Sequence, residues 1–253
     1  MSSPLIIYGV PFSQPVRAVL WLMLYKQKPF EMVLVNPGSS SEGGSRHPDY
    51  LAKFPTGTIP SVEDKDTGFV LSESHAIMCY LCNKYDWIDL YPSDHEERAK
   101  VDSYLHLHHR NVREASIGLV APKVRKDLSF SEDFLKISHA NIDRAFKALE
   151  SGWLKKSSFL TGENLTIADL SAYVEIGQLQ SQFTNVFDFE PFPNISRWLE
   201  EMNKVSFHDE VHTSLYELGD ISKEAPSMET IISANKKAFL VLQEQLAAMK
   251  ASG

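Results

Sequence analysis

The chain has 253 residues, enough for one large domain or two small ones, and its 43% hydrophobic and 23% charged residues are typical of a globular protein with a sizeable core. Its formal net charge of −8 argues against nucleic-acid and anionic-membrane partners, because these are bound through clustered Lys and Arg. The composition therefore favours chemistry on small molecules.

The cellular compartment is predicted from what the sequence lacks. The first residues do not show the basic segment and long apolar run of a secretory signal, and no stretch approaches the roughly 20 apolar residues of a spanning helix. Cys79 and Cys82 lie too close together in one helical segment for a disulfide between them to stabilise the fold, so we expect them to be reduced. These features predict a cytoplasmic protein without a membrane partner.

The first 86 residues predict the element order β-α-β-α-β-β-α. Apolar residues alternate or recur with helical spacing, and a Gly/Ser-rich loop over 37–45 separates the first βαβ unit from the rest. An X-Pro bond opens the third strand, and a hairpin turn over 64–68 joins it to the fourth. The strands are expected at 5–10, 30–35, 58–62 and 69–71, and the helices at 15–26, at 49–53 and after Ser74.

Beyond a linker over 86–94, every periodic segment is helical. The segments are expected at 96–120, 134–149, from Thr166 onward, at 195–204 and at 228–249. The sequence thus predicts an α/β domain over 1–86 and an all-helical domain over 95–253. The last helix is too apolar to be surrounded by solvent. It either lies over the cleft as a lid or covers the back of the helical domain.

Four motifs carry a resemblance to a known family. They are "SQPVRAV" (13–19), "TGTIPSVED" (56–64), "LSESHAIMCYL" (71–81) and "TGENLTIADL" (161–170). In order and spacing they resemble the cytosolic glutathione transferases, and the serine in the first motif is similar to that of the theta class. The resemblance implies a thioredoxin-like domain followed by a helical domain. It also implies glutathione as co-substrate with no separate cofactor, and a homodimer. A dimer is also expected because the exposed sheet edge and the loop around Phe54 would gain from being covered.

Ser13 is the candidate catalytic residue. It precedes Pro15 at the expected start of a helix, where unpaired backbone N–H groups and the helix dipole stabilise an anion. No base lies in the local motif to activate a serine nucleophile, so we interpret Ser13 as a hydrogen-bond donor to the glutathione thiolate. One such bond contributes about 1.5–3 kcal/mol and the helix end about 0.3–1, so the thiol pKa should fall by roughly one to two units. A plain helix N-cap is the alternative interpretation.

The other motifs predict the rest of the glutathione site. Thr58, Ile59 and Pro60, with a cis peptide bond as in the family, would pair with the cysteinyl backbone of the tripeptide. Glu73 and Ser74 stand at a helix start, where they would hold the γ-glutamyl ammonium and carboxylate, or simply cap the helix.

The position that would bind the glycine carboxylate departs from the family. The family places a His or a basic residue in this loop, whereas alignment back from Tyr50 puts Ser45 at the His position. Arg46 is therefore the candidate, with His47 as a nearby substitute.

The electrophile site is expected to be apolar and to include Phe12. Arg113 shares a helical stripe with His106, His109 and Arg110, and the family uses this helix to line the cleft. Arg113 is therefore a second candidate, and the alternative interpretation of the stripe is a solvated face with Arg110 paired to Glu114.

Three further residues are assigned structural roles. Arg17 belongs to the first motif, and Thr166 with Asp169 forms a capping-box variant at a helix start. No metal site is predicted, because His75, Cys79 and Cys82 share one helix face but lack a fourth ligand.

Together these features predict a theta-like glutathione transferase that joins glutathione to hydrophobic electrophiles and also reduces organic hydroperoxides. A thiol oxidoreductase on the same fold would need a cysteine at the position of Ser13. A non-catalytic protein that binds glutathione or another ligand is the alternative from a different class.

Overall fold

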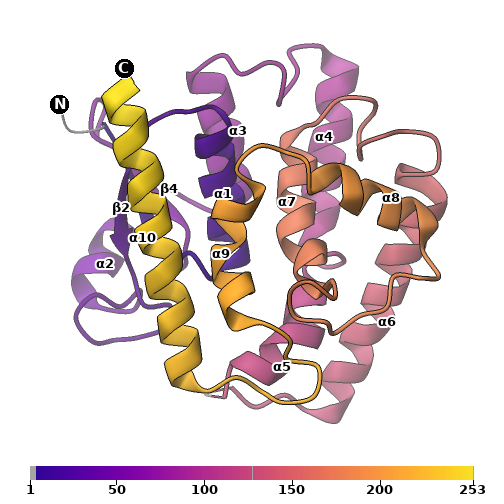
Figure 1. Ribbon diagram of the computed structural model, residues 1–253. Coiled ribbons are helices and arrows are strands. Elements are labelled where there is room, and N and C mark those ends of the chain that lie inside the picture. The colour runs from indigo at the N-terminus through magenta and orange to yellow at the C-terminus, as the bar shows by residue number, and fades with distance from the viewer. Residues whose placement is uncertain (1–3, 127, 253) are drawn as a thin grey trace.

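Four short strands form one mixed sheet in the order β2-β1-β3-β4 (Figure 1). The computed structural model describes residues 4–126 and 128–252. Strand β1 pairs in parallel with β2 and antiparallel with β3, so that Ile7 lies opposite Met32 on one side and Val62 on the other. The strands are β1 (Leu5–Gly9), β2 (Glu31–Leu34), β3 (Ser61–Asp64) and β4 (Phe69–Ser72).

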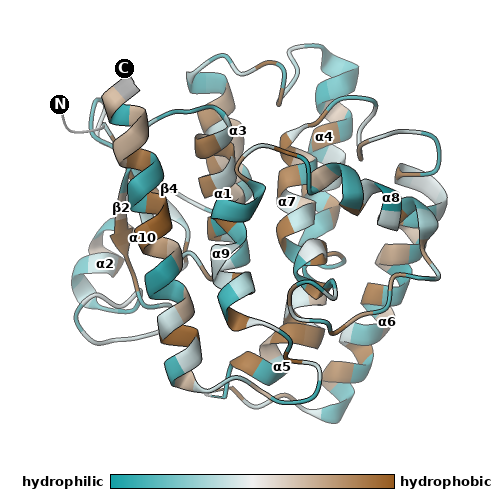
Figure 2. Cartoon of the chain, in the orientation of Figure 1, coloured by the Kyte–Doolittle hydropathy of each residue, from teal (hydrophilic) through white to brown (hydrophobic). Residues whose placement is uncertain are grey.

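Helix α1 (Gln14–Tyr25) runs through the centre of the molecule. Every residue from Val16 to Leu24 is buried, because the helix packs against α3 (Ser74–Lys84) on one side and against helices of the second half on the other. Figure 2 shows the corresponding concentration of apolar residues along α1 and α3. The short helix α2 (Pro48–Lys53) completes this part, which has the predicted β-α-β-α-β-β-α order.

The second half is helical in all its regular elements among the described residues. Helix α7 is buried over its whole length and packs against both α1 and α4, which joins the two halves. The elements are α4 (His95–His108), the π-helical turn η1 (Ala115–Val120), α5 (Ala121–Val124), α6 (Glu132–Ala148), the π-helical turn η2 (Leu149–Trp153), α7 (Ile167–Ile176), the short 3₁₀ turn η3 (Gly177–Leu179), α8 (Pro193–Met202), α9 (His208–Leu218) and α10 (Met228–Ser252). This thioredoxin-like sheet domain followed by a helical domain confirms the predicted fold class.

The predicted continuous helix over 96–120 is wrong. Helix α4 ends at His108, and turns lead into η1. The Asn111 side chain donates to the Leu107 carbonyl at 2.8 Å, and in a continuing helix that carbonyl would accept from the Asn111 backbone. The local side-chain bond therefore competes with the helix at this point.

Three smaller differences also have physical causes. The strand expected at 58–62 begins only at Ser61, because Pro60 has no N–H for the ladder. Helix α9 was not predicted, although Val211, Leu215 and Leu218 have helical spacing, because buried polar residues interrupt its apolar face. Phe54 is 2% exposed and packs on Tyr8, so its own chain already covers it.

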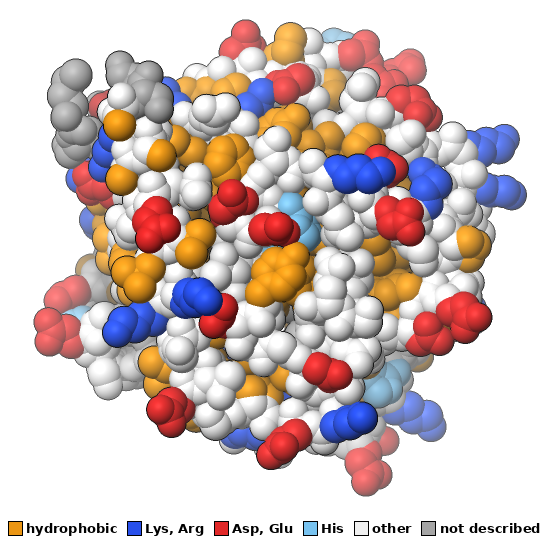
Figure 3. All heavy atoms as spheres, viewed as in Figure 1, with side chains coloured by type: hydrophobic (Ala, Val, Ile, Leu, Met, Phe, Trp, Pro, Cys, Tyr) orange, Lys and Arg blue, Asp and Glu red, His pale blue; other side chains and the backbone are white. Residues whose placement is uncertain are grey.

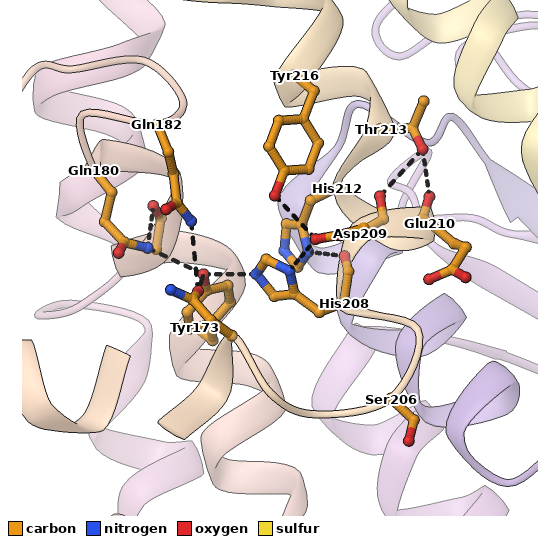
Figure 4. A network of polar contacts seen from close by, with 12 residues as sticks. Tyr173, Gln180, Gln182, Ser206, His208, Asp209, Glu210, His212, Thr213 and Tyr216 are labelled. Atoms are coloured by element: carbon orange, nitrogen blue, oxygen red, sulfur yellow. Dashed lines mark hydrogen bonds and ion pairs between the residues drawn. The ribbon is translucent and has the colours of Figure 1, made fainter. Parts of the chain in front are cut away.

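A partly buried polar and aromatic network fixes α9 against α7 (Figure 4). The Tyr173 hydroxyl lies 2.8 Å from His208 Nε2, and His208 Nδ1 lies 2.7 Å from the Asp209 carboxylate. Tyr216 donates to the same carboxylate at 2.9 Å. The His212 side chain is fully buried and has no contact with solvent. The burial of His212 holds its pKa well below the ordinary value, so the ring is neutral.

No helix in the described ranges is both long enough and apolar enough to cross a lipid bilayer.

Candidate active site

Two adjoining cavities open between the sheet domain and the helical domain. The larger is about 500 Å³ and the smaller about 170 Å³. Their linings share Pro15, Thr58, Ile59 and Arg113, so they form one continuous cleft. Loops at one end of the sheet and the start of α1 form one wall, and α4, α7 and η1 supply side chains to the other.

Ser13 lies in the larger cavity, directly before α1. It has the extended backbone of an N-cap residue, yet its side chain caps no N–H group and makes no hydrogen bond within the described part of the chain. The half-buried hydroxyl is therefore free to donate to a ligand. Pro15 follows in the first turn of the helix, which leaves fewer backbone donors to satisfy there.

The Thr58–Pro60 segment forms the border between the two cavities. The Ile59–Pro60 peptide bond is cis, as predicted. The Thr58 carbonyl accepts from the Tyr50 hydroxyl at 2.7 Å, which ties the segment to α2. Thr58 and Ile59 line both cavities, and Pro60 lines the smaller one.

Glu73 and Ser74 line the smaller cavity at the start of α3. Glu73 has a φ of 75°, which is uncommon for a residue other than glycine and costs free energy. Its side chain is exposed and makes no capping bond, whereas Ser74 is buried. A strained residue with a free carboxylate beside a buried hydroxyl is suited to hold the two charged ends of an amino acid.

The structure separates the two candidates for the glycine carboxylate. Arg46 lies at the rim of the larger cavity, where Gly57, with a φ of 62°, allows it to pass close to the backbone. A Cβ atom on Gly57 would lie 2.9 Å from the Arg46 guanidinium. His47 instead caps α2 by accepting from the Asp49 N–H at 3.3 Å, and it lines a separate cavity.

The far wall of the larger cavity is apolar. Phe12 lies near Ser13, and the rest of the wall comes from η1, α5 and the segment that follows α5. The apolar lining residues of that wall are Ile117, Val120, Ala121, Val124, Leu128 and Phe130. The wall is built by the π-helical turn that replaces the predicted continuous helix, so sequence periodicity did not identify these residues.

Arg113 lines both cavities and bonds the buried Glu175 carboxylate. The Ser116 hydroxyl donates to the other oxygen of that carboxylate. Burial would raise the pKa of Glu175, but the Arg113 charge, the His108 ring 3.9 Å away and the hydrogen bond from Ser116 lower it to about 2. Glu175 is therefore ionised at neutral pH. The neighbouring Arg110 is exposed, and Glu114 accepts from Ser138 at 2.5 Å rather than from Arg110.

The polar network continues from Glu175 to the start of α1. Gln178 donates to the Ser116 hydroxyl, and Gln14 donates to Gln178 Oε1 at 2.8 Å. Sequence reasoning missed all of these residues except Arg113. Gln14 had a signal, since it lies inside the first motif, whereas Ser116 and Gln178 had none because their partners lie far away in the sequence.

The residues with predicted structural roles are buried. Arg17 donates to the Phe12 carbonyl at 2.6 Å and to the Val174 carbonyl at 3.1 Å, which links α1 to α7. Burial lowers the pKa of Arg17 to about 10. The Asp169 carboxylate accepts from the Thr166 N–H at 3.0 Å, which completes a capping box, and also from the Trp198 indole at 3.0 Å.

No cluster of His, Cys, Asp and Glu within residues 4–126 and 128–252 could hold a metal ion. Cys79 and Cys82 carry free thiols, and burial raises their pKa values to about 11 and about 12. Neither thiol is therefore ionised at neutral pH.

Comparison with known proteins identifies the family. Residues 7–93 match the model of the glutathione S-transferase N-terminal domain, and residues 112–205 match that of the C-terminal domain. Human glutathione S-transferase theta-1 is 30% identical over 226 residues, which cover 86% of this chain and 91% of that protein. Mouse glutathione S-transferase theta-3 is 29% identical, with 92% and 94% covered. The chain belongs to the glutathione S-transferase family.

The class follows from the same relatives. The solved structure of human glutathione-S-transferase T1-1 in its apo form has a TM-score of 0.71 and 26% identity, and covers 97% of this chain and 99% of that one. Together with the mammalian theta proteins, it makes the chain theta-like. Glutathione S-transferase T3 of Arabidopsis thaliana is 30% identical over 235 residues, but the chain spans only 39% of the length of that relative.

Proposed function

We propose that the protein transfers glutathione to small hydrophobic electrophiles, with Ser13 stabilising the glutathione thiolate. The observation that carries this proposal is the Ser13 hydroxyl, which has no partner among the described residues and lies at the start of α1 inside the cleft. The family supplies the co-substrate, since its members use glutathione and need no further cofactor.

The tripeptide would lie along the border between the two cavities. Ile59 pairs with its cysteinyl backbone, Glu73 and Ser74 hold the γ-glutamyl ammonium and carboxylate, and Arg46 receives the glycine carboxylate. This orientation points the sulfur toward Ser13 and the apolar wall, where the electrophile binds. A thiolate in an open cleft can also reduce an organic hydroperoxide, so we include peroxidase activity in the proposal.

The test is the pKa of the bound glutathione thiol in the native protein and in Ser13→Ala. Loss of the hydroxyl is expected to raise this pKa by about one to two units, because one bond to a charged sulfur contributes about 1.5–3 kcal/mol. At pH 6.5 the kcat/KM should then fall by about 10- to 100-fold. The thiolate absorbance near 240 nm gives the pKa directly.

Two results would contradict the proposal. An unchanged thiol pKa and unchanged turnover in Ser13→Ala would remove Ser13 from the chemistry. Retention on immobilised glutathione without turnover of any electrophile in a panel would favour the non-catalytic binding protein. Ser131→Ala is a matched control, because that serine caps α6 at the surface, where its hydroxyl accepts from the Phe134 N–H at 3.2 Å.

We also propose that the protein is a cytoplasmic homodimer. Phe69 and Val70 on the edge strand β4 are 43% and 37% exposed, and Phe134 and Ile137 on α6 are 40% and 63% exposed. By contrast, the face that carries α9 and α10 shows apolar side chains in small groups among charges of both signs (Figure 3). Light scattering at micromolar concentration should give twice the mass of the chain, and a monomer mass would contradict the dimer.

A further inference from the structure

The loop Val10–Phe12 joins β1 to α1 and places Ser13 in the cleft. Because the Ser13 side chain makes no hydrogen bond to any residue that the structure describes, its position depends on how this backbone is held. Two of the holding bonds are local. The Ser13 N–H donates to the Val10 carbonyl at 3.1 Å, and Arg17 of α1 donates to the Phe12 carbonyl at 2.6 Å.

The C-terminal helices supply the other bonds to this loop. The Phe12 N–H donates to the Asn235 side-chain oxygen of α10 at 3.0 Å, across 223 positions of sequence. The Asn235 amide nitrogen donates to the Ile231 carbonyl at 3.2 Å, which turns the oxygen of the amide toward Phe12. Ser214 of α9 reaches the Pro11 carbonyl at 3.5 Å, the outer limit of a hydrogen bond.

Both helices are firmly seated, so they can hold the loop in place. Figure 1 shows α10 running alongside α9, and Ala234, Ala238, Leu242 and Leu246 of α10 are buried. The network in Figure 4 fixes α9 in turn against α7. These helices lie beyond residue 205, where the match to the family model ends.

We propose that Asn235 is a positioning residue for the thiolate chemistry: by accepting from the Phe12 N–H, it holds the Ser13 hydroxyl where the glutathione sulfur binds. The role rests on the proposed function of Ser13. It assigns α10 to the support of the active-site loop. Among the described lining residues of the two cleft cavities, none comes from α10, so the helix acts from behind the loop.

The test compares the bound-thiol pKa in the native protein, Asn235→Leu and Asn235→Ala. Without the acceptor, the loop is free to shift, and a misplacement of about 1 Å can cost 100-fold in rate. We expect a partial effect, with the pKa raised by about 0.5–1 unit and kcat/KM at pH 6.5 lowered by about 3- to 10-fold. Above pH 9 the rates should converge, because the thiol then ionises without help.

Lys237→Ala is the matched control. Lys237 lies two residues further along α10 and pairs with Glu217 of α9, so its removal disturbs the same helix without touching the loop. Its bound-thiol pKa should equal the native value. Asn235→Asp keeps the acceptor oxygen, and in 1 M salt, where charges are screened beyond about 3 Å, it should shift the pKa less than Asn235→Leu does.

The outcomes separate this inference from the proposed function. If Ser13→Ala raises the pKa but Asn235→Leu and Asn235→Ala lower only the thermal stability, the positioning role is overturned and the function of Ser13 stands. Equal shifts of the bound-thiol pKa in Asn235→Asp and Asn235→Leu would also overturn it, because the pKa would then not depend on the acceptor oxygen at residue 235. If Ser13→Ala leaves the pKa unchanged, the proposed function itself fails.

Discussion

The two ends of α7 hold buried carboxylates whose pKa values move in opposite directions. Asp169 in the first turn is 0% exposed, and burial raises its pKa to about 6. Glu175 near the last turn is 1% exposed, and its pKa is lowered to about 2. Burial alone penalises both charged forms, so the difference comes from their partners.

The partners differ in charge. Within the described part of the chain, the donors to Asp169 are all uncharged: the Leu160 and Thr166 N–H groups, the Thr166 hydroxyl and the Trp198 indole. Glu175 bonds the Arg113 guanidinium, a cationic donor. The cation therefore keeps Glu175 ionised beside the cleft at neutral pH. The neutral donors around Asp169 instead leave a helix cap that changes its charge near pH 6.

The largest pH-dependent effect is expected for Glu175→Gln. A fall of the pKa from 4.5 to about 2 corresponds to about 3 to 4 kcal/mol of stability, which is fully present above pH 4.5 and is lost as the pH falls toward 2. The variant should therefore lose about 3 kcal/mol in the free energy of unfolding at pH 7, and much less at pH 3. Urea denaturation of both proteins at pH 7, 4 and 3 measures the difference.

If the loss of unfolding free energy in Glu175→Gln does not shrink toward pH 3, the ion pair with Arg113 is not what stabilises the Glu175 carboxylate. Arg113→Met provides the converse test, since it leaves the carboxylate buried without its cation and should destabilise by about 3–5 kcal/mol at pH 7. The double variant Arg113→Met with Glu175→Met should be more stable than Arg113→Met alone, because no unpaired charge remains.

The same contrast explains how much of the site could be predicted from the sequence. The Asp169 cap could be predicted from the sequence because Thr166 is only three residues away, inside a recognisable motif. Glu175 carried no signal, because Arg113 is 62 residues away and Ser116 is 59 away. Residues such as Ser13 and Ile59 were likewise named from local motifs, and the cleft brings them together, although their roles remain predictions.

The fold follows the same rule. The sheet domain was predicted element by element, because each strand or helix shows its own period and turn signals. The failures arose where distant or side-chain contacts decide, as when the Asn111 side chain ends α4, or when α9 buries His208 and His212 in a network with α7. The boundary between the two domains, expected between residues 86 and 95, stays a prediction.

A smaller destabilisation, with the opposite dependence on pH, is expected for Asp169→Asn. The asparagine has nearly the shape of the protonated acid, but its amide nitrogen faces N–H donors, so the variant should be destabilised at every pH. A folded pKa of about 6 against 3.8 means that wild-type stability from this group is fully present below pH 3.8 and is lost as the pH rises through 6. The destabilisation should thus be largest near pH 4 and about 2 to 3 kcal/mol smaller at pH 7.

Urea denaturation at pH 4, 5, 6 and 7 measures this slope, and Asp133→Asn controls for the general effect of pH. Asp133 lies in the first turn of α6, as Asp169 does in α7, but its side chain is exposed. A destabilisation by Asp169→Asn that grows from pH 4 to pH 7 would mean that the neutral donors outweigh burial. In that case a cation would not be needed to keep a carboxylate ionised inside α7, and the distinction between its two ends would disappear.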